Sequence, residues 1–75
     1  MKIVQIKLSA IKEITNFVNT VGKYSADVKL KSGNYIVNAK SIMGIFLLDL
    51  MKPVDLIVNG NDSNLLLNEV SQYIV

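Results

Sequence analysis

Apolar and polar side chains alternate at the start of the chain and then change to a helical spacing. Residues 2–8 carry an apolar side chain at every second position, which indicates a half-buried strand: Val4, Ile6 and Leu8. From residue 11 the apolar side chains recur every three or four positions, which indicates a helix with one buried face: Ile11, Ile14, Val18 and Val21. We expect Ser9 to supply the hydroxyl N-cap of this helix and Gly22 to end it in a left-handed conformation.

Residues 26–39 predict a β-hairpin. Two alternating runs, Ala26 to Lys31 and Tyr35 to Ala39, flank Ser32-Gly33-Asn34, which has the composition of a turn. A second helix is expected from Ser41 to about Leu50, because the following Lys52-Pro53 cannot continue a helix.

Residues 54–58 alternate again and predict a fourth strand, which the polar turn at residues 59–62 ends. The last segment has an apolar helical face: Leu66, Leu67, Val70, Tyr73 and Ile74. The element order is therefore β-α-β-β-α-β-α, which is typical of an α+β fold with helices over an antiparallel sheet. The length of 75 residues, without a linker or repeat, predicts a single domain over residues 1–75.

Composition narrows the range of functions. The chain has no cysteine and no histidine, so we expect no disulfide, no thiol catalysis, no metal site and no cofactor. A net charge of +2, without arginine, is too weak to favour binding to nucleic acid. The longest apolar run, residues 42–48, is too short for membrane insertion. The N-terminus lacks the pattern of a secretory signal, and we expect a cytoplasmic protein.

The segment from Tyr24 to Leu50 resembles the HPr family of phosphocarrier proteins from the bacterial sugar phosphotransferase system. The string Lys40-Ser41-Ile42-Met43-Gly44, between a strand and a helix, carries most of the resemblance, and the element order extends it over the whole chain. The resemblance implies an open-faced β-sandwich, with a four-stranded antiparallel sheet in the strand order 1-4-2-3 and three helices on one face.

The resemblance breaks between the first strand and the first helix. HPr proteins carry a Gly-Leu-His-(Thr/Ala)-Arg-Pro loop there, whose histidine accepts phosphate at a helix N-terminus. The positions nearest to that missing loop here are Ser9, Ala10 and Lys12, with Lys12 as the nearby cation. Ser9 would form a stable phosphoester, and an acyl phosphate on Glu13 would need an activating group that the chain does not supply. Phosphotransfer through a non-histidine acceptor stays open only as the weaker alternative.

Ser41 and the apolar residues after it are the other candidate site. Ser41 has the position of an N-cap, and the resemblance implies a second role, because a regulatory kinase phosphorylates the matching serine in Gram-positive HPr proteins. Ile45 and Leu48 fit an inward face of the second helix, which leaves Ile42, Met43 and Phe46 as an outward protein-docking surface. The resemblance implies that these positions dock enzyme I, transporter components or a transcription regulator.

Our first hypothesis is therefore a regulatory or protein-binding module of the HPr type that is not an enzyme. The alternatives are a phosphocarrier component with a non-histidine acceptor, or a self-associating structural domain unrelated to sugar transport. The expected partners are proteins, either phosphotransferase-system components, a transcription regulator or a second copy of this chain.

Overall fold

The computed structural model describes all residues from 1 to 75. The elements follow the predicted order: β1 (Lys2–Ile6), α1 (Ile11–Val21), β2 (Asp27–Ser32), β3 (Tyr35–Asn38), α2 (Ile42–Ile45), β4 (Val54–Asn59) and α3 (Ser63–Glu69), followed by the short 3-10 helix η1 (Ser71–Tyr73). No helix is long and apolar enough to span a bilayer. No group of three or more metal-ligating side chains comes together.

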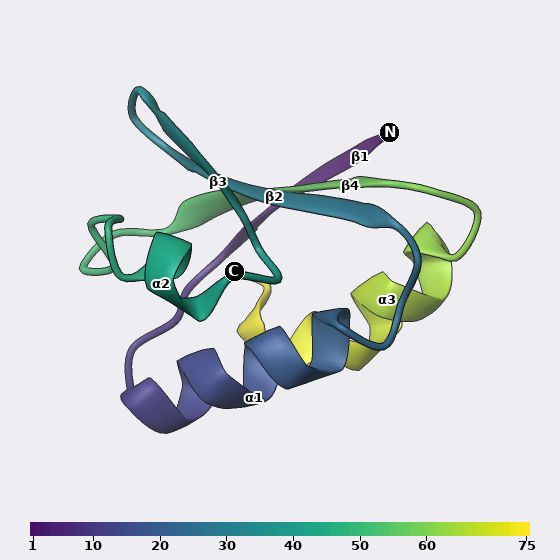
Figure 1. Cartoon of the computed structure of the whole chain (residues 1–75), viewed down its shortest axis with the longest axis horizontal. Helices are drawn as coiled ribbons and strands as arrows, with labels where there is room; N and C mark the ends of the chain where they lie inside the picture. The colour runs from purple at the N-terminus through teal and green to yellow at the C-terminus, as the bar shows by residue number, and fades with distance from the viewer.

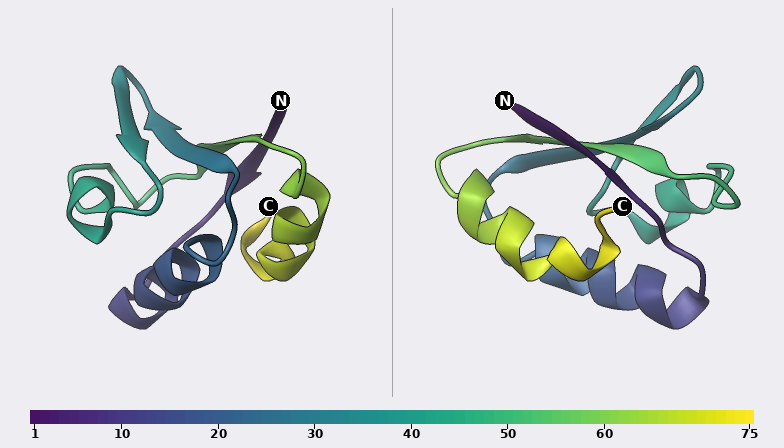
Figure 2. Two further views of the ribbon diagram at one scale, coloured as in Figure 1. Left: turned by 45° about the vertical axis from the view of Figure 1, so that its right-hand side comes forward. Right: turned by 180° about the vertical axis from the view of Figure 1, so that it is seen from behind.

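The strands form one antiparallel sheet in the order β1-β4-β2-β3. All three α-helices lie on the same side of this sheet, as Figure 1 and the two views of Figure 2 show. The tip of the β2–β3 hairpin points away from the helices (Figure 2), and Gly33 turns it with a φ of 59°, which a residue without a side chain adopts at low cost. The predicted fold class and strand order are confirmed.

The period-two pattern of the strands sets which face of the sheet is covered. Val4 lies opposite Leu56, and Val28 lies opposite Val58, so these apolar side chains share the inner face. The helices close this face with one cluster of 17 buried residues. At its centre the rings of Phe17 and Tyr73 meet edge to face, with centroids 5.9 Å apart, a geometry that adds about 0.5–1.5 kcal/mol to the burial of the rings. This contact ties α1 to η1.

The predicted ends of several elements were wrong. Gly22 ends α1 in a right-handed conformation, with a φ of −64°, because the chain leaves the helix through a further turn in which Lys23 and Tyr24 still donate to helix carbonyls. The last helix is divided in two at Val70, where ψ is 11°.

This division lets the C-terminal residues leave the helical layer and reach the sheet. Ile74 is extended and forms a bridge with Ile6, and the N–H of Val75 donates to the carbonyl of Gln5 at 3.0 Å. Ile74, predicted on the helical face, instead covers part of the free edge of β1. The rest of that edge is open.

Candidate functional site

The N-terminus of α1 is the place where the HPr resemblance puts the phosphate. Ala10 is the N-cap residue, and its methyl side chain accepts no hydrogen bond. The carboxylate of Glu13, one turn later, reaches back and accepts hydrogen bonds from the N–H groups of Ser9 at 2.8 Å and Ala10 at 3.3 Å. These two bonds, with the charge of Lys7, hold the pKa of Glu13 below its usual 4.5 against the smaller opposing effect of desolvation. The start of α1 therefore already holds a carboxylate from the helix itself, that of Glu13.

Ser9 is not the N-cap, so that prediction was wrong. The helix begins one residue later than expected, and the hydroxyl of Ser9 instead accepts a hydrogen bond from the ammonium of Lys7 at 3.3 Å. Lys7 also donates to the carbonyl of Leu50 at 2.9 Å, which joins the β1–α1 connection to the segment after α2. Lys12 is therefore not the only cation near this helix end, because β1 contributes Lys7 as well.

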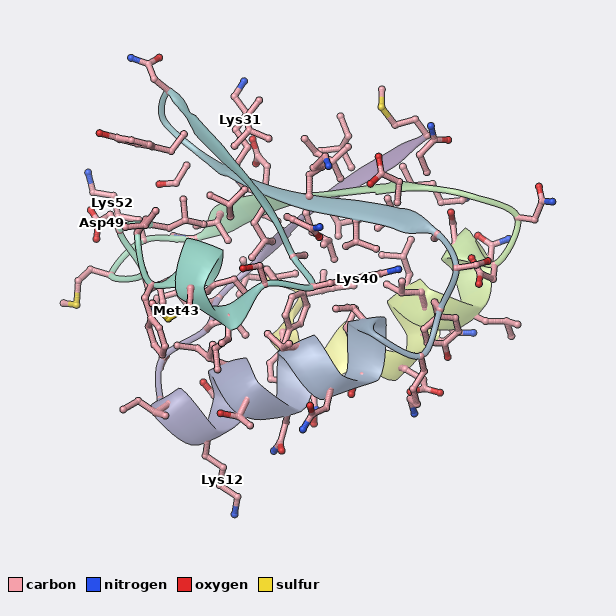
Figure 3. All side chains as sticks on the ribbon, in the orientation of Figure 1. Lys12, Lys31, Lys40, Met43, Asp49 and Lys52 are labelled. Carbon is pink, nitrogen blue, oxygen red and sulfur yellow. The ribbon has the colours of Figure 1, made fainter.

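Ser9, Ala10 and Lys12 come together on the wall of a shallow hollow of about 410 Å³. The side chain of Lys12 forms no hydrogen bond or ion pair and extends away from the rest of the molecule in Figure 3. Glu13 lies on the same wall, but the hollow has no histidine, since the chain has none. A phosphohistidine cannot form at this position.

Ser41 is the N-cap of α2, as its position predicted. Its hydroxyl oxygen accepts a hydrogen bond from the N–H of Gly44 at 3.3 Å. A side chain on Gly44 would bring a Cβ atom within 3.2 Å of the Cβ of Val37, so the glycine allows α2 to lie close to β3. Ser41 is exposed and is open to modification. Lys40, just before it, points inward and donates from Nζ to the carbonyl of Tyr24 at 2.7 Å (Figure 3).

The exposed side of α2 is apolar. Met43 and Leu47, four positions apart, are 75% and 71% exposed, and Phe46 between them is 48% exposed. We call Met43, Phe46 and Leu47 the α2 patch. Ile45 and Leu48 are buried, so the predicted inward face is confirmed.

Two expectations about α2 were wrong. Ile42 was expected in the outward surface, but it is only partly exposed and packs against the core, whereas Leu47 joins the patch unexpectedly. The helix also ends at Ile45 rather than near Leu50. The next N–H groups donate to carbonyls three residues back, from Leu47 to Gly44 and from Leu48 to Ile45. These tighter turns rotate Leu47 outward while Leu48 reaches the core.

Two of the lysines form ion pairs with carboxylates. Lys23 pairs with Glu69 at 2.9 Å, and Lys29 pairs with Asp27 at 3.4 Å. Glu69 also accepts a hydrogen bond from the Tyr24 hydroxyl at 2.7 Å, which raises the pKa of Tyr24 to about 12. The bonds from Tyr24 and then Lys23 lower the pKa of Glu69. This cluster joins the end of α1 to α3.

Comparison with known proteins identifies the group to which the chain is related. The model of the family described as the PTS HPr component phosphorylation site matches residues 10–75. The chain belongs to the HPr family. Members of this family are phosphocarrier proteins rather than enzymes.

Solved structures agree with this assignment. HPr-C-His from Thermoanaerobacter tengcongensis matches with a TM-score of 0.84 and 30% identity, over 96% of this chain and 89% of that protein. The phosphocarrier protein HPr from Bacillus anthracis matches with a TM-score of 0.76 and 27% identity, over 99% and 94%. Crh, the catabolite repression containing protein of Bacillus subtilis, matches with a TM-score of 0.72 and 32% identity, over 93% and 82%. The Crh structure is described as a dimer with a swapped domain.

Proposed function

We propose that this member of the HPr family is a regulatory protein-binding module that docks through the α2 patch and does not carry phosphate. The observation that carries the proposal is that the apolar side chains of Met43, Phe46 and Leu47 are exposed next to one another. The chain also has no histidine that could carry phosphate. An exposed apolar group with a methionine and an aromatic ring is typical of protein-contact surfaces. A cytoplasmic location and phosphotransferase-system partners remain predictions.

The helix N-terminus supports the loss of phosphate transfer. Glu13 places a carboxylate at the start of α1, where its charge opposes a bound phosphoryl group at close range. Incubation with phosphoenolpyruvate and enzyme I should leave the mass unchanged. An added phosphate that is lost in acid would overturn the proposal and favour a non-histidine acceptor, such as the carboxylate of Glu13.

A matched pair of leucine variants tests the docking surface. Leu47 in the α2 patch is 71% exposed, and Leu65 on α3 is 63% exposed, so a lysine at either position should leave the fold intact. We expect the wild-type chain to bind enzyme I or an HPr-binding transcription regulator in isothermal titration calorimetry. Leu47→Lys should weaken this binding at least tenfold, and Leu65→Lys should not change it. Equal effects of both variants, or no binding by the wild type, would contradict the docking proposal.

Ser41 is the proposed regulatory position within the same surface. A phosphate there would lie beside the first turn of α2 and would place negative charge next to Met43. Incubation with ATP and an HPr kinase should give an acid-stable phosphate on the wild type and none on Ser41→Ala. Because that variant loses its N-cap, at a typical cost of about 1 kcal/mol, its circular dichroism must first show a folded protein. If the kinase does not phosphorylate the wild-type chain, Ser41 is not a regulatory position.

Self-association is the second candidate, and the swapped dimer described for Crh favours it. In this chain β1 is the element most easily exchanged, because it is the N-terminal edge strand and pairs with a single strand, β4, with only the short Ile74 bridge on its other side. Four residues, 7–10, join it to α1. Short connections of this kind promote exchange between identical chains.

An engineered disulfide distinguishes exchange of β1 from other kinds of dimer. Gln5 and Asp55 lie opposite each other on the outer face of the sheet, with their side chains 3.4 Å apart. The carbonyl of Gln5 faces away from β4, so the pair is not hydrogen-bonded through its backbone and its Cβ atoms are close. The natural chain has no cysteine. With Gln5→Cys and Asp55→Cys, a swapped dimer becomes covalent in a non-reducing gel, whereas an unswapped chain closes its disulfide internally.

A further inference from the structure

The turn between β4 and α3 contains a chemically reactive pair of residues, Asn59 and Gly60. This turn lies at the end of the molecule away from α2 (Figure 1). Among the asparagines of the chain, only Asn59 is followed by glycine. The backbone nitrogen of the residue after an asparagine can attack the side-chain amide, and glycine, which has no Cβ atom, hinders this attack least. The sequence therefore makes Asn59 the asparagine at which such an attack is easiest.

The structure leaves both reacting groups free of hydrogen bonds. Asn59 is exposed, and its side chain makes no hydrogen bond to the protein, in contrast to Asn38, whose amide oxygen accepts from the N–H of Lys40 at 2.9 Å. The N–H of Gly60 has no acceptor in the protein either, whereas the carbonyl of Gly60 accepts from the N–H and the hydroxyl of Ser63. Neither group has to break a hydrogen bond before it reacts.

The backbone at Asn59 is held on one side only. Asn59 is the last residue of β4 and pairs with Asp27, the first residue of β2. A rotation that brings the nitrogen of Gly60 to the amide carbon of Asn59 disturbs only this terminal pair. The ends of a sheet open at a lower free energy than its centre. Asn59 can therefore reach the reactive geometry while the rest of the sheet stays paired.

We propose that Asn59 is a site of spontaneous deamidation. The nitrogen of Gly60 forms a bond with the amide carbon of Asn59, and the side-chain nitrogen leaves as ammonia, which takes up the proton of the Gly60 N–H through water. The product is a five-membered succinimide ring. Water then opens this ring at one of its two carbonyl groups. One opening leaves aspartate at position 59, and the other leaves isoaspartate, in which the main chain runs through the side-chain carbon.

Both products weaken the pairing of β4 with β2. Each adds a negative charge at position 59, directly opposite the carboxylate of Asp27, and like charges in this arrangement destabilise a sheet. Isoaspartate also lengthens the main chain by one carbon next to Gly60. The backbone is already close-packed there, because a Cβ atom on Gly60 would lie 2.8 Å from Ala26. The isoaspartate form should therefore be less stable than the aspartate form.

The next part of the turn cannot easily absorb the longer main chain. Asp62 anchors the turn to the segment before β2, because its Oδ2 atom accepts from the N–H of Ser25 at 3.0 Å and from its hydroxyl at 3.3 Å. The other carboxylate oxygen, Oδ1, is buried without a partner. A buried acceptor without a hydrogen bond costs free energy, so this anchor is only partly compensated. The extra carbon of isoaspartate should displace Asp62 from Ser25.

The experiment is incubation of the full chain in mildly alkaline buffer made with H₂¹⁸O, followed by peptide mapping with tandem mass spectrometry. Position 59 should exchange ammonia for water and carry one ¹⁸O atom, because water opens the succinimide. Asn61, which is exposed in the same turn but is followed by aspartate, is the control within the same molecule. Asn59 should react at least about tenfold faster than Asn61. Asn59→Gln keeps an amide but needs a larger ring, so position 59 should stay unmodified in this variant.

A second measurement follows the stability of the products. The added negative charge separates them from the unmodified chain by ion exchange, and methylation by an isoaspartyl methyltransferase identifies the isoaspartate form. In thermal unfolding, Tm should fall in the order wild type, Asn59→Asp and isoaspartate form.

Three outcomes would overturn the proposed site. The first is an equal rate at Asn59 and Asn61, and the second is deamidation without any isoaspartate, which would exclude the succinimide. The third is reaction of the urea-unfolded chain but not of the folded chain, which would mean that the fold protects Asn59. An isoaspartate form as stable as Asn59→Asp would refute the predicted effect of the longer main chain. None of these results involves the α2 patch, so the docking proposal is tested separately.

Discussion

Replacing Ile45 or Met43 by alanine tests how α2 divides its side chains between the core and the surface. The two residues lie on the same turn of helix, and both are large and apolar. Ile45 is fully buried in the core cluster, whereas Met43 is 75% exposed. The same substitution at these two positions should therefore have very different effects on stability.

The expected difference follows from burial. Ile45→Ala removes fully buried carbon atoms and leaves a cavity beneath α2, a change that costs about 2–5 kcal/mol. A chain of 75 residues is expected to have a free energy of unfolding of roughly 4–11 kcal/mol. The variant thus loses a large part of its stability, and its Tm should fall by roughly 8–40 °C, since each kcal/mol corresponds to about 4–8 °C in a domain of this size. Met43→Ala should stay within about 0.5 kcal/mol of the wild type.

Urea unfolding followed by circular dichroism measures both free energies under the same conditions. If Met43→Ala cost more than about 1.5 kcal/mol, Met43 would be part of the core and the α2 patch would not exist as described. If Ile45→Ala cost less than about 1 kcal/mol, the assignment of Ile45 to the buried face of α2 would be wrong. Met43→Ala should at the same time weaken binding of the protein partner. This single variant therefore distinguishes an effect on binding from an effect on the free energy of unfolding.

Two further predictions concern the ends of α1 and β4. Gly60→Ala places a Cβ atom 2.8 Å from both Cα and Cβ of Ala26, which the backbone must move to accommodate. Thermal unfolding should show a loss of about 1–3 kcal/mol, and an unchanged Tm would mean that this close approach is absent. For Glu13, the lowered pKa means that its charged form stabilises the fold above the unfolded pKa near 4.5, and this contribution is lost as the pH falls through the lower folded value. Glu13→Gln should therefore be less stable than wild type at pH 6, and the difference should shrink as the pH approaches 3. A difference that is constant or that grows on acidification would contradict the role of the carboxylate.

Much of the fold follows from local sequence patterns. The period-two runs place the inner-face residues of β2 and β4, and the string at Ser41 predicts both the N-cap and the start of α2. The turn predicted at Ser32-Gly33-Asn34 does join the two strands of the hairpin. These features depend on neighbouring residues along the chain, and so the chain alone carries the information.

The candidate site was predictable only in part. Met43 and Phe46 were placed on the surface from helical spacing, but that spacing assumes a regular helix, and α2 becomes a tighter turn after Ile45. The sequence also gives no sign that Lys7 reaches Leu50. Glu13 three positions after Ala10 is a weak capping signal that could have moved the helix start away from Ser9.

The sequence by itself determined the order of the elements, the family and the absence of a histidine, because each depends only on which residues occur and how they are spaced. Only the tertiary structure decided which apolar residues of α2 are exposed and where the last helix divides. These features depend on contacts between segments far apart in the chain, such as Phe17 with Tyr73 and Ile6 with Ile74. Packing selects among conformations that local spacing leaves equally open, and here it defines the surface on which the docking proposal rests.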